Sequence, residues 1–292
     1  MSICVDRCAI NPIISVQELV GLHDDVLIVD CRHDLMHHDA GAQAYAEGHL
    51  PGAAFLRVED DLSGPKSGRN GRHPLPTPQA FAQTLAALGA NENTLIIGYD
   101  ASAGMFASRL WWLCRWIGHL KCGVLDGGFQ AWCAADGPLS QDPFQTKRTG
   151  KISVRPSLAP LWTHEHVSAW LKSGSDPEIA LMIDARAPER FRGDVEPLDP
   201  VAGHIPGSIN RAFAHNLGPD GRFKPASQLH QEFSSLLNDR DPMCVVHSCG
   251  SGVTACHNLL AMEIAGLPGS ALYAGSWSEW CADPSRPVAK GD

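Results

Sequence analysis

The chain has 292 residues, of which 44% are hydrophobic and 19% charged, a composition typical of a folded protein long enough for two domains. Its formal net charge of -9 argues against nucleic acid or an anionic membrane as a partner, because both need a basic face. Residues 1–15 lack the pattern of a secretory signal, and no apolar run approaches the roughly 18 residues that span a bilayer. We therefore expect a cytoplasmic protein.

Short apolar runs alternate with helical patterns along the first half of the chain. The run at 26–29 is closed by Asp30 and Arg32. Another run at 94–97 precedes a helical pattern over 106–117, with its apolar residues on one face. Strands that alternate with helices are typical of βαβ units around a parallel sheet, so we predict an α/β fold.

The second half of the chain repeats this order at a spacing of about 150 residues. The motif Gly-His-Leu-Pro-Gly at 48–52 recurs as Gly-His-Ile-Pro-Gly at 203–207. Apolar runs at 180–183 and 243–246 correspond to the two earlier strands, and a helical pattern over 253–265 follows the second of them. We predict two tandem domains, over 1–145 and 161–292, joined by a linker at 146–160.

A cysteine with unusual surroundings follows the strand predicted at 243–246. Cys249 lies just past the carboxyl end of a parallel strand and just before a helix, where unpaired N–H groups and the helix dipole favour an anion. Gly250 and Gly252 allow the backbone to wrap around the sulfur and stabilise a thiolate or a persulfide anion. Asp100 occupies the same position in the first copy, so we predict that the first domain is catalytically silent.

Other cysteine chemistries fit the sequence less well. A phosphatase-type loop needs an arginine six residues after the cysteine, and Ala255 stands there. There is no Cys-x-x-Cys motif and no cluster with zinc spacing, so we expect neither a metal nor another cofactor. A non-enzymatic sulfur- or redox-sensing module remains open, although Cys256, two helical turns further on, is poorly placed to resolve a modified Cys249.

Taken together, these motifs resemble the tandem rhodanese-domain sulfurtransferases over nearly the whole chain. The resemblance implies that a sulfane sulfur is carried as a persulfide on Cys249 of the C-terminal domain. The neutral loop Cys-Gly-Ser-Gly-Val-Thr resembles the 3-mercaptopyruvate type, with Gly250, Gly252, Val253 and Thr254 expected around the substrate. The thiosulfate type, which carries basic side chains in this loop, is the alternative, since thiosulfate is a dianion.

The resemblance also implies a proton relay. Ser251 resembles a loop serine that is linked in this family to a histidine and an acidic residue of the first domain. His73 matches the histidine, and Glu59 falls where the family has an aspartate. The counterpart of His73 in the second copy is Phe223, so this histidine is not part of the shared scaffold. We expect a Ser/His/acid relay that assists proton transfer from the substrate thiol.

Two arginines of the second domain are separated by comparison with the first. Arg186 has a twin in Arg32, which suggests a structural ion pair. Arg190 has no twin and resembles the family's arginine for the substrate carboxylate, a role suited to a guanidinium. A second substrate arginine is expected nine residues further on, and Asp199 stands there, which weakens the case for 3-mercaptopyruvate unless another cation such as Arg192 substitutes.

The reaction implied by the resemblance needs a sulfur donor and a sulfur acceptor. We expect a small-molecule sulfur donor and a thiol acceptor, with a thioredoxin-like dithiol protein as the acceptor in the cell and cyanide as a substitute in vitro.

Overall fold

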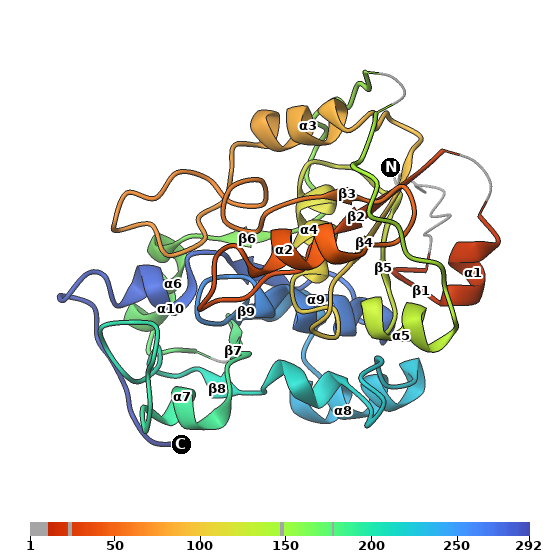
Figure 1. Ribbon diagram of the computed structural model, residues 1–292. Coiled ribbons are helices and arrows are strands. Elements are labelled where there is room, and N and C mark those ends of the chain that lie inside the picture. The colour runs from red at the N-terminus through yellow and green to blue at the C-terminus, as the bar shows by residue number, and fades with distance from the viewer. Residues whose placement is uncertain (1–10, 23–24, 147–148, 177) are drawn as a thin grey trace, which may run out of the picture.

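The computed structural model describes residues 11–22, 25–146, 149–176 and 178–292. Within them the chain forms two five-stranded sheets, both parallel, with strand orders β1-β5-β4-β2-β3 and β6-β10-β9-β7-β8 (Figure 1). Each order maps onto the other strand for strand, so the predicted α/β fold and the duplication are both confirmed.

The first domain places its helices around its sheet. Its strands are β1 (Ile13–Ile14), β2 (Val26–Asp30), β3 (Ala54–Phe55), β4 (Leu95–Tyr99) and β5 (Cys122–Leu125). Its helices are α1 (Val16–Val20), α2 (Ala40–Glu47), α3 (Pro78–Ala87), α4 (Ala107–Trp116) and α5 (Gly128–Ala134). The central strand β4 leads into α4, as the apolar runs predict.

The second domain repeats this plan. Its strands are β6 (Leu161–Trp162), β7 (Leu181–Asp184), β8 (Ile209–Asn210), β9 (Val245–Ser248) and β10 (Ala271–Tyr273). Its α-helices are α6 (His164–Lys172), α7 (Pro188–Arg192), α8 (Ala226–Leu237), α9 (Thr254–Ile264) and α10 (Ser276–Trp280), and two 3-10 turns are η1 (Phe213–Asn216) and η2 (Pro242–Cys244). None of the helices described is long and apolar enough to cross a membrane.

The strand predicted at 243–246 begins later than the apolar run suggests. Pro242 starts η2, and the Asp241 carboxylate caps that turn by accepting a hydrogen bond of 2.8 Å from the Met243 N–H. Proline fixes φ and lacks an N–H, so the chain enters a turn before it joins the sheet. The strand β9 therefore runs over Val245–Ser248 and delivers Cys249 directly past its carboxyl end.

The two domains share a buried interface in which α4 packs against α9. Leu110 and Leu113 of α4 belong to the same apolar cluster as Leu259 and Leu260 of α9. Fully burying a side chain of this size contributes about 1.5–3 kcal/mol, so these leucines stabilise the contact between the two helices. This contact holds the amino-terminal ends of both helices close together. The loop before α4 consequently meets α9 at the interface, where Nε2 of His257 in α9 lies 3.0 Å from the carbonyl oxygen of Ala103.

Candidate active site

The loop of Cys249 wraps around its sulfur. The thiol is buried, with 1% of the residue exposed, and its Sγ accepts a hydrogen bond of 3.1 Å from the N–H of Gly252. Gly252 has φ of +74°, and a Cβ there would lie 2.2 Å from the carbonyl oxygen of Ala274. Only glycine fits this position. The N–H of Cys249 donates to Ser276 Oγ at 3.0 Å, which fixes the start of the loop.

The matching loop of the first domain holds an anion of its own. The Asp100 carboxylate is fully buried and accepts hydrogen bonds of 2.7–2.9 Å from four backbone N–H groups, those of Ser102, Gly104, Phe106 and Ala107. Burial raises the pKa of Asp100, and these hydrogen bonds act in the opposite direction. The loop between the central strand and the following helix is therefore an anion-binding nest in the first domain, as predicted for the second.

A hydrogen bond across the domain interface joins two of the predicted relay residues. The Oγ of Ser251 lies 2.8 Å from Nδ1 of His73, which is 3% exposed. Burial, and after it the positive charge of Arg109, lower the pKa of His73 to about 3. His73 is therefore a neutral imidazole near neutral pH, and it can pass on a proton without retaining the charge.

The acidic member of the predicted relay is less well placed. Glu59 lies with its carboxylate 3.7 Å from Nζ of Lys66 and 3.7 Å from Nε2 of His38. Nε2 of His73 has no hydrogen-bond partner among the described residues, so the structure does not join Glu59 to the relay by a hydrogen bond. Its role in proton transfer stays a prediction.

The relay residues Glu59 and His73 lie close to a third possible metal ligand, His33. Ligand atoms of His33, Glu59 and His73 all lie within 4.8 Å of one another. The Lys66 ammonium beside Glu59, and the positive charges that lower the pKa of His73, oppose a cation at this place.

The twin arginines form the structural ion pairs that the repeat predicts. Arg186 binds the Asp184 carboxylate at 2.7 Å and the carbonyl oxygen of Gly203 at 2.8 Å. In the first domain, Arg32 makes the same contact with Asp30 at 2.7 Å and with a carbonyl of the first Gly-His-Leu-Pro-Gly motif at 2.7 Å. In both copies the guanidinium ties the end of one strand to the glycine motif.

Arg190 lies beside the loop of the cysteine. A Cβ atom on Gly250 would lie 3.5 Å from both Nη1 and Nη2 of Arg190. The Nε and Nη2 atoms of this arginine bind the Glu196 carboxylate at 3.2 and 2.6 Å, which fixes the side chain. Arg192 pairs with Asp194 at 2.8 Å, and its role as a substitute cation stays a prediction.

The sequence did not single out two further arginines, both from the first domain. Arg109 is fully buried and donates hydrogen bonds of 3.0 Å to the carbonyl oxygens of Gly252 and His73. Burial lowers its pKa, and the hydrogen bond to Gly252 places this cation against the loop that carries Cys249. The available signal was an arginine near the start of an apolar helical pattern.

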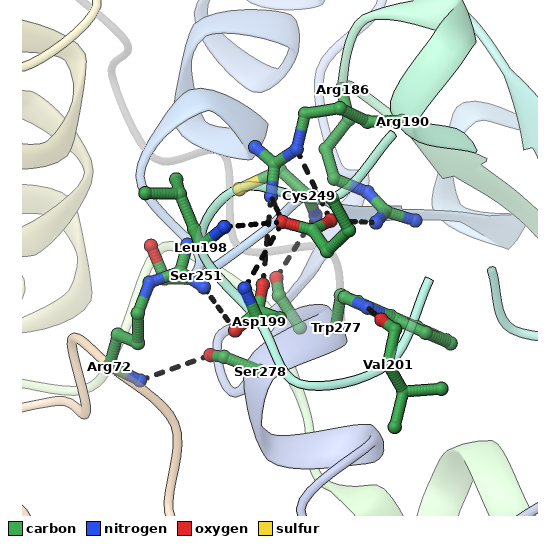
Figure 2. A network of polar contacts seen from close by, with 12 residues as sticks. Arg72, Arg186, Arg190, Leu198, Asp199, Val201, Cys249, Ser251, Trp277 and Ser278 are labelled. Carbon is green, nitrogen blue, oxygen red and sulfur yellow. Dashed lines mark hydrogen bonds and ion pairs between the residues drawn. The ribbon is translucent and has the colours of Figure 1, made fainter. Parts of the chain in front are cut away.

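The other missed residue is Arg72, whose guanidinium reaches into the second domain. It forms an ion pair with Asp199, and its Nη2 would lie 2.9 Å from a Cβ atom on Gly250 (Figure 2). Comparison of the repeats did not distinguish it, because Gly71–Arg72 recurs at 221–222 in the second copy.

The remaining predicted substrate residues begin the helix after the cysteine. Val253 is the N-cap residue of α9, and Thr254 is the first residue of that helix.

Cys256 lies in the first turn of α9 and is a structural residue. It donates to the carbonyl oxygen of Gly252 at 3.3 Å, and burial raises its pKa to about 12. It is therefore a protonated structural thiol. All eight cysteines in the described ranges are free.

Comparisons with known proteins agree with this geometry. The family model described as "Rhodanese-like domain" matches residues 15–135 and 167–283. A Pseudomonas aeruginosa protein named "Probable 3-mercaptopyruvate sulfurtransferase" is 50% identical over 271 residues, which cover 92% of this chain and 93% of that protein. The thiosulfate sulfurtransferase of Bos taurus is 34% identical over 257 residues, which cover 85% of this chain and 82% of that one.

Solved structures give the same result. A 3-mercaptopyruvate sulfotransferase from Escherichia coli superimposes with a TM-score of 0.77 at 30% identity, over 92% of this chain and 100% of the other. The chain belongs to the rhodanese-like family, of which it carries two tandem domains. Within that family it is a sulfurtransferase enzyme, not the non-enzymatic module that the sequence left open.

Proposed function

We propose that this sulfurtransferase moves a sulfane sulfur from 3-mercaptopyruvate to a thiol acceptor through a persulfide on Cys249. One observation carries the proposal: Cys249 replaces the Asp100 carboxylate in a duplicated anion-binding loop. A persulfide places a terminal anionic sulfur one atom beyond Sγ, and a carboxylate likewise extends its oxygens one atom beyond Cγ. The four N–H groups around Asp100 therefore support the binding of an anionic side chain of this reach.

The first half-reaction needs a thiolate and a leaving carbanion. The Cys249 thiolate attacks the sulfur of 3-mercaptopyruvate, a new S–S bond forms, and the C–S bond breaks. The electron pair of that bond passes to the carbon and gives the enolate of pyruvate. The proton of the substrate thiol completes pyruvate by moving to this carbon, a transfer that Ser251 and His73 can assist through their 2.8 Å contact.

The carboxylate of the donor needs a cation at the edge of the loop. Arg190 supports this role because its guanidinium lies beside Gly250, next to the reacting cysteine, and is held by Glu196. A carboxylate bound there would leave the thiol end of a three-carbon donor free to reach Sγ of Cys249. Such an ion pair gives orientation as well as affinity.

The second half-reaction regenerates the enzyme. The thiolate of the acceptor attacks the outer sulfur of the persulfide, the S–S bond breaks, and its electron pair returns to Sγ of Cys249. With a dithiol of the thioredoxin type, the second thiol then displaces hydrosulfide and leaves a disulfide on the acceptor. With cyanide, the product is thiocyanate.

Thiosulfate is the second candidate donor. The guanidinium groups of Arg72 and Arg190 beside Gly250 favour an anionic donor, and a thiosulfate sulfurtransferase is among the relatives. The neutral side chains of Gly250 and Ser251 nevertheless supply no charge in the loop itself, which favours the donor with a single carboxylate.

Comparing kcat/KM for the two donors tests the proposal. The enzyme is incubated with each donor and with either cyanide or a small dithiol, and pyruvate, thiocyanate and sulfide are measured. We expect 3-mercaptopyruvate to be preferred, and the intact mass without acceptor to increase by one sulfur atom. A preference for thiosulfate would mean that thiosulfate, and not 3-mercaptopyruvate, is the donor. Turnover without any sulfur on Cys249 would refute the persulfide mechanism.

A further inference from the structure

We infer that Arg72, held by Asp199, is the second cation of the donor's carboxylate site, so that this site is assembled from both domains. The inference rests on the proposed function, because it concerns how a donor with one carboxylate is held beside Cys249. It assigns a binding role to a residue of the domain that carries no nucleophile, and a positioning role to Asp199.

The two guanidinium groups converge on one glycine. A Cβ atom on Gly250 would lie 2.9 Å from Nη2 of Arg72 and 3.5 Å from the two Nη atoms of Arg190. Gly250 is the residue directly after Cys249. In Figure 2, Arg72 lies on the left of the view and Arg190 on the right. Gly250 therefore lies in close contact with both cations, one residue from the proposed reacting sulfur.

An acidic residue anchors each of these arginines. Arg190 uses its Nε and Nη2 atoms for Glu196, and Arg72 uses Nη1 for Asp199. The Nη2 atom of Arg72 remains beside Gly250. A guanidinium presents donors along more than one edge, so it can bind its anchor and a substrate carboxylate together.

The two anchors are themselves connected. Oε1 of Glu196 accepts hydrogen bonds from the backbone N–H groups of Leu198 and Asp199, at 3.0 and 3.2 Å. Asp199 Oδ2 lies 3.6 Å from Nη2 of Arg190. The Asp199 side chain is 3% exposed, and burial raises its pKa while Arg72 acts to lower it. Asp199 is thus part of a buried charge network whose structure requires a cation from the first domain.

The backbone of Arg72 is fixed by the second domain as well. Its N–H donates to Ser278 Oγ at 3.0 Å. Ser278 belongs to α10, whose backbone N–H groups donate to the loop of Cys249. The residue that follows, His73, contacts Ser251 at 2.8 Å. Two consecutive residues of the first domain therefore bring a cation and the relay imidazole to the same loop.

A charge-swap experiment tests the inference. Steady-state kinetics with 3-mercaptopyruvate are compared for the wild type, Arg72→Ala, Arg72→Asp and the double variant Arg72→Asp with Asp199→Arg. We expect Arg72→Ala to raise KM about 10- to 100-fold with kcat changed only a few-fold, because the lost contact binds the ground state and the transition state alike. Arg72→Asp should raise KM further. The double variant should bring KM most of the way back to the wild-type value, because a guanidinium again faces Gly250.

Matched controls separate the possible failures. Arg57→Ala removes a partly exposed arginine of the same domain, paired with Asp39 at 3.3 Å, and should leave KM unchanged. Arg72→Lys keeps the charge with little risk to folding, and it should raise KM less than Arg72→Ala does. Unaltered KM in Arg72→Ala, or a double variant no better than Arg72→Asp at equal thermal stability, would overturn the inference. If the wild type itself forms no pyruvate, the proposed function fails first, and this inference falls with it.

Discussion

The loops after β4 and β9 are the same structure put to two uses. In the first domain the Asp100 carboxylate fills the nest permanently and is held by four backbone N–H groups. In the second domain Cys249 occupies the equivalent position, and one N–H reaches its sulfur at 3.1 Å. The comparison teaches that anion binding belongs to the scaffold, whereas reactivity comes from one side chain.

The first domain, which has Asp100 in place of a cysteine, also contributes to the candidate site. Arg72, His73 and Arg109 of the first domain all contact the loop of Cys249 or the residues that flank it. In the proposed mechanism, one domain therefore carries the nucleophile, and the other supplies charged and hydrogen-bonding groups that surround it. The predictions below test this division of roles.

The largest effect is expected at the nucleophile. Cys249→Ser should abolish sulfur transfer, because a serine hydroxyl is neither ionised near neutral pH nor able to hold a sulfane sulfur. The measurement is pyruvate release together with the intact mass after incubation with donor. Residual turnover above about one thousandth of the wild-type rate would mean that another group carries the sulfur.

Replacing the relay histidine by its twin should have the next largest effect. His73→Phe puts into the first domain the residue found at the matching position, Phe223. We expect kcat to fall about 100-fold, because assistance by a general acid-base group contributes factors of this order. Persulfide formation measured in a single turnover should slow to the same extent. An unchanged kcat would remove His73 from the mechanism.

The carboxylate arginine should act mainly on KM. Arg190→Ala removes a guanidinium beside Gly250, so we expect KM for 3-mercaptopyruvate to rise about 10- to 100-fold with a smaller change in kcat. Arg192→Ala is the matched control from the same helix, since that side chain pairs with Asp194. Equal effects of the two substitutions would mean that the donor binds elsewhere.

Replacing Asp100 in the loop of the first domain should lower the stability of the fold and leave kcat nearly unchanged. Asp100→Ala leaves buried N–H groups without their acceptor, and we expect a loss of about 2–4 kcal/mol in the free energy of unfolding. The kcat of the folded enzyme should change less than about twofold, which is a small effect on the scale of the preceding variants. Denaturant unfolding and kinetics on the same preparation measure both quantities, and a large fall in kcat would show that the first loop takes part in the reaction.

Acid should weaken the fold gradually through buried histidines. Burial lowers the pKa of His73 and His247 to about 3 and that of His257 to about 4, from an unperturbed value of 6.5. Between these values the unfolded chain binds protons that the folded chain does not, so the free energy of unfolding falls as pH falls below about 6.5. Each histidine contributes up to about 1.4 kcal/mol per pH unit in that window.

His73→Phe provides the check on this pH dependence. The variant lacks one of the three buried imidazoles, so its stability should decline less steeply between pH 6.5 and 4 than that of the wild type. Urea unfolding at a series of pH values gives both slopes. Identical slopes would show that His73 titrates normally in the folded protein.

The sequence alone predicted the fold and the reactive loop because both depend on local pattern. Alternating strands and helices, the repeated glycine motifs and the glycines around Cys249 are short-range features that determine backbone conformation wherever they occur. The same comparison of repeats distinguished Arg186, a structural residue with a twin, from Arg190. It did not single out Arg72, which has a twin in Arg222.

The tertiary structure alone decided what surrounds the sulfur of Cys249. Asp199 appeared from the sequence to weaken carboxylate binding, and the structure pairs it with Arg72, more than a hundred residues earlier in the chain. Glu59 lies near His73 without a hydrogen bond to it, and Arg109 reaches the carbonyl of Gly252 through the domain interface. Such contacts depend on how α4 packs against α9, and no local pattern records which distant charge a buried side chain will meet.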